Sequence, residues 1–327
     1  MNENKPKLPV QLEKNWEYCG NLGEGAMGLV VKVKHRKKGT IGAAKLIHTA
    51  LFEMPSAVKR FTREAHIAQK LTSPYIVGSL DVFPGNKKSP EPYIIFEFVD
   101  GGNLQDLLRK KKLLTDNALD LILNLAEGMS FAHQQGVIHR DFKPENILMV
   151  NDKHPKIADF GLASLNEQAE KLTVTGQMMG TPAYMAPEQL QGKKVNESAD
   201  IYALALVAFE LLSGRRPCEA TDLPSIIQSR LTCNPPRLRS FAPAVLPPIA
   251  NVIDKCLSIK IEDRCQSAEE LIVEIKAARK SSSIMARSSI EATLPPALAQ
   301  ARKDKLTKSA LKKQKRQERL TKICSLH

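Results

Sequence analysis

The pattern of apolar and polar positions changes about a third of the way along the chain. Apolar and polar residues alternate within short runs at 29–34 (Leu-Val-Val-Lys-Val-Lys) and 93–98 (Tyr-Ile-Ile-Phe-Glu-Phe), which is typical of strands. Residues 57–71 instead repeat apolar side chains at helical spacing. The early part of the chain is therefore predicted to form a small sheet with one main helix.

The remaining two thirds of the chain are predicted to be mainly helical. An apolar stripe follows Asp116 and stops before Gly136, which is placed to end a helix. A second apolar helix is predicted at about 196–212, and two or three more between 223 and 278. Strands followed by helices predict an α+β fold with a small sheet-containing lobe and a larger helical lobe.

A glycine-rich segment lies at the start of the first predicted strand. Its spacing fits G-x-G-x-x-G-x-V, which is also compatible with an ordinary turn or with a dinucleotide-binding loop. A dinucleotide-binding loop must open a helix, whereas here a strand follows. We therefore expect a hairpin whose backbone amides approach phosphate groups. The candidate loop residues are Gly23, Glu24, Gly25, Ala26, Met27, Gly28 and Val30.

Two carboxylates fall on the apolar faces of predicted helices. Glu64 shares a stripe with Phe61 and Ala68, and a buried carboxylate is costly unless it is paired. Lys45, in an apolar stretch upstream, is a natural partner whose ammonium would then face a phosphate. Asp200 sits in the same way on its helix, and the spacing alone leaves open a helix cap or an anchor for another loop.

The segment from His139 to Asn146 (HRDFKPEN), followed by Asp-Phe-Gly at 159–161, carries the chemistry of phosphoryl transfer. That reaction needs positioning and charge neutralisation more than covalent help from the protein. Asp141 can accept the hydrogen bond of an attacking hydroxyl, and Lys143 can reach the transferred phosphate. Asn146 and Asp159 supply the oxygen ligands that magnesium prefers.

With these motifs the chain resembles the eukaryotic-like protein kinases over about residues 12–279. The segments at 60–65 (RFTREA), 98–104 (FVDGGNL) and 180–190 (GTPAYMAPEQL) look most like bacterial serine/threonine kinases. The resemblance implies a two-lobed kinase fold, with an N-lobe of about 12–98 and a C-lobe of about 99–279. It also implies transfer of the ATP γ-phosphate to serine or threonine hydroxyls of protein substrates.

The resemblance further assigns roles to individual residues. Lys45 pairs with Glu64 and contacts phosphates, Asp141 is the catalytic base, and Asn146 and Asp159 hold Mg²⁺, with Mn²⁺ as an alternative. Asp200 holds the backbone at 139–140, and Glu188 pairs with Arg264. The expected nucleotide-binding set comprises the glycine-rich loop, Ala43, Lys45, Leu148, Asp159, Phe96 as gatekeeper, and the hinge residues Glu97 and Val99.

Thr173 and Thr175 lie between Asp159 and Glu188 and are candidates for regulatory phosphorylation. Arg140, directly before Asp141, could bind such a phosphate, although both threonines could also be plain loop residues. Three positions depart from the usual family pattern: Ala68, Ala205 and Cys265. Of these, the small Ala68 bears on regulation, because it could loosen the helix that carries Glu64.

Charge is concentrated at the end of the sequence. The net charge is +13, and residues 280–327 hold 12 Lys or Arg and 3 Asp or Glu, a net of +9. This serine-rich and then basic tail is expected to be disordered or marginally helical, and it could bind an acidic partner, an anionic membrane surface or nucleic acid. It also suggests a rival function, polyanion binding through the tail.

A second rival is a pseudokinase scaffold, against which the intact motifs argue. The six cysteines are scattered, and neither a signal sequence nor an apolar membrane span is apparent, so a reduced, cytoplasmic protein is expected. The natural substrate, the activating signal and the oligomeric state cannot be read from the sequence.

Overall fold

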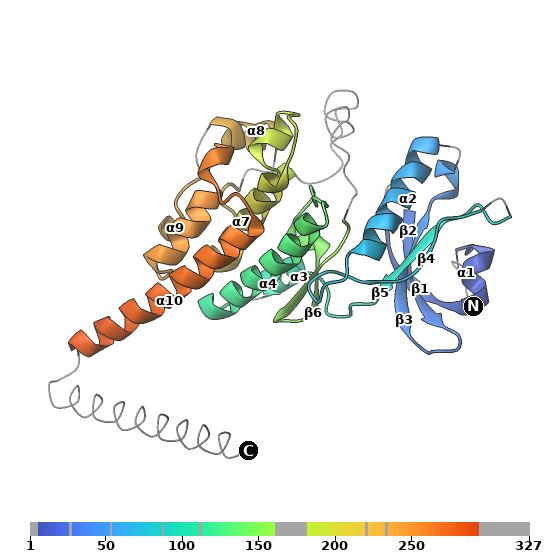
Figure 1. The fold of residues 1–327 in the computed structure, drawn as a ribbon, viewed down its shortest axis with the longest axis horizontal. Helices are drawn as coiled ribbons and strands as arrows, with labels where there is room; N and C mark the ends of the chain where they lie inside the picture. The colour runs from blue at the N-terminus through green and yellow to red at the C-terminus, as the bar shows by residue number, and fades with distance from the viewer. Residues whose placement is uncertain are drawn as a thin grey trace, which may run out of the picture. The chain divides into compact units, whose positions relative to one another are not determined.

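A five-stranded antiparallel sheet forms the N-terminal part of the computed structural model (Figure 1). The structure describes residues 6–25, 28–52, 54–86, 88–110, 113–160, 182–219, 222–232 and 235–293. The strands are β1 (Trp16–Gly25), β2 (Gly28–His35), β3 (Ile41–Ile47), β4 (Ser79–Phe83) and β5 (Tyr93–Glu97), in the order β1-β2-β3-β5-β4. Both predicted strands are present, and a strand, not a helix, follows the glycine-rich segment.

Each face of this sheet is covered by apolar side chains. On one face, Leu8 and Leu12 of the N-terminal segment with α1 (Val10–Asn15) join Val31, Val33 and Ile95 in one cluster. On the other face lies the helix α2 (Pro55–Lys70), whose buried residues Ala57, Phe61, Ala65 and Ala68 cluster with Ile47 and Ile94. The helical stripe predicted for 57–71 is the one that α2 buries.

Gly28 begins β2 where the strand passes very close to β3. A Cβ atom at this position would lie 1.8 Å from the carbonyl oxygen of Leu46, which is backbone and cannot turn aside. Only glycine fits there without moving a strand. The glycine therefore sets how closely the start of β2 approaches β3, the strand that carries Lys45.

The C-terminal part is mainly helical. It begins with α3 (Leu104–Lys110) and α4 (Thr115–Gln134), which ends before Gly136 at φ +71°, as the sequence predicted. A hairpin of β6 (Ile147–Asn151) and β7 (His154–Ile157) follows. The later helices are α6 (Pro187–Leu190), α7 (Glu197–Ser213), α8 (Leu223–Thr232), α9 (Pro247–Cys256) and α10 (Ala268–Thr293), with short 3₁₀ turns at 49–51, 144–146, 182–184, 238–240 and 261–263.

Helix α7 is the centre of this part. Every residue from Ser198 to Ser213 is buried, and α7 contacts both α4 and α9. Its N-terminus is capped by the side chain of Asn196, and Gly214 ends it in the left-handed conformation at φ +78°. Asp200 is thus a buried carboxylate in the first turn of a helix that is apolar on all sides.

The end of the chain differs from expectation in one respect. The helical pattern was predicted to stop near Ser281, but α10 runs on to Thr293. Serine is only mildly unfavourable in a helix, and residues 284–292 are mostly helix formers. By contacts, the chain divides into a compact unit of residues 1–276 and a second of 277–327. Among the described helices, none has the length and apolar character needed to cross a bilayer.

Candidate active site

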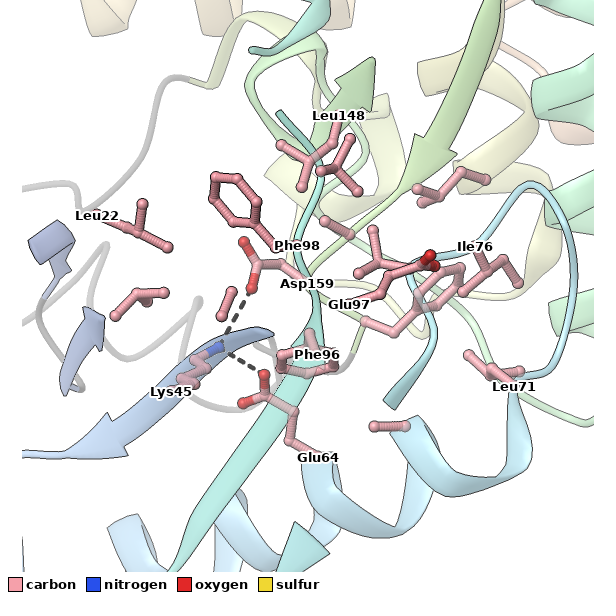
Figure 2. Close-up of a pocket in the computed structure, with 18 of the residues that line it drawn as sticks. Leu22, Lys45, Glu64, Leu71, Ile76, Phe96, Glu97, Phe98, Leu148 and Asp159 are labelled. Atoms are coloured by element: carbon pink, nitrogen blue, oxygen red, sulfur yellow. Dashed lines mark hydrogen bonds and ion pairs between the residues drawn. The ribbon is translucent and has the colours of Figure 1, made fainter. Parts of the chain in front are cut away.

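A cavity of about 500 Å³ opens between the sheet strands, α2 and the β6–β7 hairpin (Figure 2). One end is apolar and is lined by Leu22, Val30, Ala43 and Leu148. Polar side chains line another part of the wall, where Lys45, Glu64 and Asp159 meet. The cavity therefore offers an apolar slot next to a charged group, which suits a ligand with a flat ring and an anionic end.

Lys45 bridges two carboxylates from distant parts of the chain. Its Nζ lies 2.5 Å from Glu64 Oε1 on α2 and 3.2 Å from Asp159 Oδ1. Burial alone would lower the pKa of Lys45, but the Asp159 and Glu64 carboxylates outweigh it and raise that pKa. The lysine is thus a fixed positive charge at the wall of the cavity, and Glu64 is the buried partner that the sequence predicted.

Of the described residues other than glycine, two have positive φ, and both are in this region. Arg140 has φ +67° and Asp159 has φ +58°. Such conformations cost free energy of order 1–3 kcal/mol and persist only where the surroundings impose them. At Arg140 the surroundings include two fixed backbone groups: its N–H donates to Asp200 and its C=O accepts from Gln189.

The loop from His139 to Asn146 is held together by bonds to Asp141. Lys143 Nζ lies 3.1 Å from Oδ1 and 2.8 Å from Oδ2 of Asp141. Asn146 Nδ2 donates to the Asp141 carbonyl oxygen at 2.8 Å and to its Oδ2 at 3.1 Å. These bonds use the amide nitrogen of Asn146, so its side-chain oxygen is the atom that a cation would take. Three predicted residues therefore share one hydrogen-bonded group.

Asp200, on α7, anchors this loop. Its Oδ2 accepts from the His139 N–H and its Oδ1 from the Arg140 N–H, each at 2.8 Å. A third partner is His133 on α4, whose Nε2 lies 2.8 Å from Asp200 Oδ2. Of the two alternatives for Asp200, the structure shows the loop anchor. Asn196 caps α7, and Asp200 binds the loop.

A second set of bonds ties the residues around α6 to the same loop. Gln189 accepts a hydrogen bond from the Ala186 N–H at 3.0 Å and donates one to the Arg140 carbonyl oxygen at 2.8 Å. Glu188 forms a two-pronged ion pair with Arg264, at 2.8 and 2.9 Å, as the family resemblance implied. Neither His133 nor Gln189 was predicted from the sequence.

The predicted nucleotide-binding residues divide into three groups. Those that line the cavity are Gly23, Val30, Ala43, Lys45, Phe96, Glu97, Val99, Leu148 and Asp159. Glu24, Gly25 and Gly28 belong to β1 and β2 but are not part of its lining. Ala26 and Met27 lie outside the described residues, as do the candidate phosphorylation sites Thr173 and Thr175.

The hinge makes three contacts that the sequence did not predict. The Glu97 carboxylate accepts from the Gly78 N–H at 2.8 Å and from Lys156 Nζ on β7 at 2.7 Å. Lys32 on β2 places its ammonium 4.1 Å from the ring centre of Phe98, which also lines the cavity. All three contacts hold the segment that joins β5 to the C-terminal part.

The small side chain of Ala68 leaves the cavity larger at this point. Ala68 lines the cavity together with Leu71, Ile76 and Val77, so the cavity continues beyond Phe96 toward α2. A larger residue at position 68 would fill that extension. The departure noted in the sequence therefore leaves space beside the helix that carries Glu64.

The chain is similar in sequence and fold to known proteins. Residues 16–274 match the protein kinase domain family. The probable serine/threonine-protein kinase SCO3848 of Streptomyces coelicolor is 30% identical over 272 residues, which is 82% of this chain and 40% of that protein. Serine/threonine-protein kinase Pkn1 of Myxococcus xanthus is 35% identical over 250 residues, 75% of this chain and 36% of that protein.

The chain thus spans about two fifths of the length of these relatives. Among solved structures, the PknI kinase domain of Mycobacterium tuberculosis superimposes with a TM-score of 0.63 at 26% identity, covering 85% of this chain and 100% of that domain. The match extends from Trp16, at the start of β1, to Glu274 in α10, and so includes the sheet, the cavity and the loop around Asp141. The chain belongs to the protein kinase family.

Proposed function

We propose that this chain transfers the γ-phosphate of ATP to serine and threonine hydroxyls of proteins. The observation that carries the proposal is the closed Lys45–Glu64 ion pair with Asp159 on the same ammonium, next to the Asp141 loop. In protein kinases this ion pair must be in place for transfer to occur. The names of the two curated relatives support serine and threonine as the acceptors.

The residues present fit ATP and Mg²⁺. The apolar slot between Ala43 and Leu148 suits an adenine ring, and Lys45 suits the α- and β-phosphates. The side-chain oxygens of Asn146 and Asp159 would hold the metal, since magnesium prefers oxygen ligands. When bound, the ion neutralises negative charge on the phosphate groups.

The protein's own part in the reaction centres on Asp141. Its carboxylate is partly exposed and is held by Lys143 and Asn146, so it can accept the hydrogen bond of a substrate hydroxyl and orient its oxygen. Lys143, 2.8 Å from Asp141, brings a positive charge to the place where the transferred phosphoryl group must pass. Asp200 and Gln189 hold the backbone that fixes these groups.

The test is transfer of labelled γ-phosphate from Mg-ATP to a generic basic protein, followed by identification of the modified amino acids. We expect phosphoserine or phosphothreonine, and a loss of kcat/KM on the order of a hundred- to a thousand-fold in Lys45→Met. Lys34→Met is the matched control, because Lys34 is exposed on β2. Nucleotide binding without transfer by the unaltered chain would indicate a scaffold and refute the proposal.

We also propose that phosphorylation of Thr173 or Thr175 activates the enzyme. A cavity of about 270 Å³ supports this, because four of its lining residues are basic: Arg63, His66, Lys70 and Arg140. Burial and the neighbouring Arg63 both lower the pKa of Arg140, so a phosphate beside them would relieve a repulsion.

Incubation of dephosphorylated enzyme with Mg-ATP should place phosphate on Thr173 or Thr175. Mass spectrometry should find the modification in the unaltered protein and not in Asp141→Asn. The double change Thr173→Ala/Thr175→Ala should lower activity at least about tenfold, equivalent to one charge-assisted hydrogen bond. Full activity in the double variant would contradict this regulation.

For the tail, we propose electrostatic tethering of a cytoplasmic kinase to an anionic surface. Residues 294–327 hold ten Lys or Arg and two Asp or Glu, a net of +8. Attraction of this kind needs no fixed geometry and concentrates an enzyme near its substrates. The free thiols of Cys19, Cys218, Cys256 and Cys265 support a reducing location.

Removal of residues 294–327 should leave kcat on a short peptide within about twofold and abolish binding to anionic vesicles or DNA at low salt. This cut keeps α10 whole, whereas removal of 280–327 cuts the helix and serves as a comparison. Changing the ten basic residues of 294–327 to Gln should act like the deletion. A large loss of peptide activity after the shorter cut would show that the tail acts on the kinase fold itself.

A further inference from the structure

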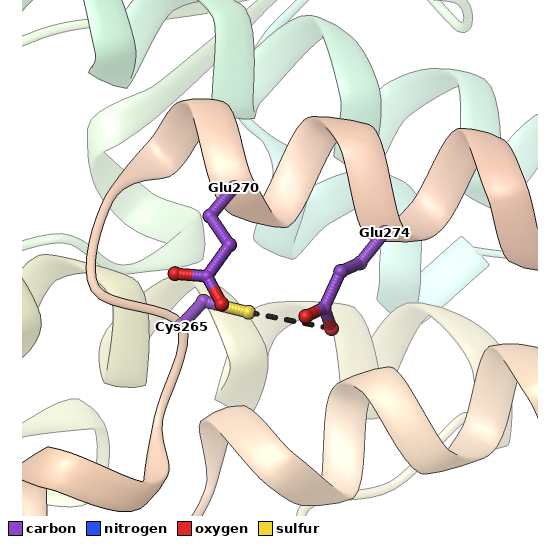
Figure 3. Close-up of side chains that lie close together, drawn as sticks. All are labelled: Cys265, Glu270 and Glu274. Atoms are coloured by element: carbon purple, nitrogen blue, oxygen red, sulfur yellow. Dashed lines mark hydrogen bonds between the residues drawn. The ribbon is translucent and has the colours of Figure 1, made fainter.

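One thiol and two carboxylates converge where α10 begins, away from the cavity described above (Figure 3). Cys265 lies in the turn before α10, and Glu270 and Glu274 project toward it from one face of that helix. Their ligand atoms all lie within 4.8 Å of one another. Cys256, the last residue of α9, is a neighbouring thiol that does not belong to this group of ligand atoms. Both cysteines are fully buried.

The cluster already binds a positive charge. Lys255 Nζ lies 2.9 Å from Glu270 Oε1 and 2.6 Å from Glu274 Oε1, so both carboxylates converge on one cation. The Lys255 side chain is 37% exposed, so its ammonium can move into solvent without being buried unpaired. The Lys255 ammonium is held by the two carboxylates, because a thiol sulfur is only a weak hydrogen-bond acceptor.

We propose that Cys265, Glu270 and Glu274 form a three-ligand site for a zinc-class divalent metal ion, with a fourth position for water, and that Lys255 occupies its cation position in the metal-free protein. A thiolate sulfur beside two carboxylate oxygens matches the ligands that Zn²⁺ takes, whereas Mg²⁺ and Ca²⁺ prefer oxygen alone. Metal uptake replaces the ammonium and releases the Cys265 thiol proton to solvent.

The geometry is close to what such an ion requires. Zn–S bonds of about 2.3 Å and Zn–O bonds of about 2.0 Å give ligand–ligand distances of about 3.3 to 3.8 Å in a tetrahedral site. Cys265 Sγ lies 3.7 Å from Glu274 Oε2, within that range. Glu270 has a ligand oxygen within 4.8 Å of the other two ligand atoms, and its Oε2 accepts a hydrogen bond from the Gln266 N–H at 2.7 Å. Its side chain is partly exposed, so a change of rotamer can bring an oxygen to tetrahedral distance.

The site adjoins a structural ion pair. Cys265 directly follows Arg264, which holds Glu188 at the N-terminal end of α6. A metal ion that fixed Cys265 to α10 would therefore also fix the backbone next to Arg264. Binding to the folded chain alone raises the free energy of unfolding with metal concentration.

The test uses the full chain with Cys19, Cys218, Cys233 and Cys324 changed to Ser, kept reduced with a reagent that contains no thiol. Titration with Co²⁺ should give one equivalent of binding, with a thiolate-to-cobalt charge-transfer band and the strong visible bands of tetrahedral cobalt, both removed by Zn²⁺. Cys265→Ser should remove the charge-transfer band and weaken binding at least about a hundredfold, since even outer-shell partners are worth 10–100-fold.

The change in Co²⁺ affinity caused by Lys255→Met is the decisive measurement. Removing the competing ammonium should tighten Co²⁺ binding about tenfold or more, the equivalent of one charge-assisted hydrogen bond. Lys260→Met, at an exposed lysine nearby, should leave the affinity unchanged. Because Lys255→Met keeps all three ligands, this measurement stands even if Cys265→Ser fails to fold.

Four results would overturn the site. The first three are no uptake by the parent chain, uptake that survives Cys265→Ser in a folded protein, and weaker binding in Lys255→Met. The fourth is recovery of a Cys256–Cys265 disulfide without metal uptake, which would assign the thiol pair to redox chemistry instead.

Discussion

Asp141→Asn should lower kcat by on the order of a hundred- to ten-thousand-fold, the range typical of a general acid–base group. The substitution keeps the shape of the side chain and one of its acceptor oxygens, but it removes the charge that Lys143 binds at 2.8 Å. The remaining amide oxygen still accepts a hydrogen bond, but it is not basic enough to take the proton of a substrate hydroxyl. KM for ATP should change little, because Asp141 is not part of the lining of the nucleotide cavity.

The measurement is steady-state kinetics on a peptide, with thermal unfolding of the same preparation. Asp141 is partly exposed, so the midpoint should move by no more than a few degrees, equivalent to about 1 kcal/mol. Asp152→Asn, on the exposed turn between β6 and β7, makes the same chemical change and should retain full activity. Near-normal kcat in folded Asp141→Asn would exclude Asp141 as the catalytic base.

The parts of the site that could be predicted are those where the sequence places a charged residue at a position that must be buried. Glu64 occupies a helical position that must face the sheet, and burying a lone carboxylate is costly, so a cationic partner had to exist. The structure supplies Lys45 at 2.5 Å, with Glu64 only 3% exposed. Asp200 was recognised in the same way, but spacing alone could not choose between a cap and a loop anchor.

The parts that could not be predicted involve residues with no such anomaly. Gln189 joins two segments through its amide, yet an uncharged polar residue in a short helix leaves no distinctive pattern. His133 lies in the last turn of α4, where a histidine would also be favourable as a surface residue facing the helix dipole. Their roles depend on which segments meet in space, which local periodicity does not encode.

The length of α10 was underestimated from the sequence. A run of three serines at 281–283 suggested a linker, because serine competes with helical hydrogen bonding. That preference is weak, amounting to a few tenths of a kcal/mol per residue, and the helix-forming residues on both sides outweigh it. The change in composition at 281–283 therefore did not mark the end of the helix.

Arg264→Met should cause the largest loss of stability of any single change considered, about 3–5 kcal/mol. Arg264 is buried and makes a two-pronged ion pair with Glu188, whose side chain is only 4% exposed. Its guanidinium also donates to the carbonyl oxygens of Ser198, Ser258 and Ile259 and lies over the ring of Tyr202. The substitution leaves a buried carboxylate without a partner and three carbonyl groups without this donor.

Arg264→Lys should recover little of this loss, because an ammonium cannot form the two-pronged pair or reach the three carbonyls together. The double change Arg264→Met/Glu188→Met should be more stable than Arg264→Met alone, since it removes the uncompensated charge. Arg239→Met is the matched control, because Arg239 is exposed and makes one long hydrogen bond at 3.4 Å. Its effect should stay within about 0.5 kcal/mol.

Urea unfolding of the four variants, with limited proteolysis of the segment around α6, measures these differences. The ion pair joins the start of α6 to the backbone at the start of α7 and the segment after α9. We therefore expect faster cleavage near 182–191 in Arg264→Met than in Arg239→Met. Because Gln189 connects α6 to the Arg140 carbonyl, kinase activity should fall as well. Equal unfolding midpoints for Arg264→Met and Arg239→Met would show that the pair does not hold this part of the fold together.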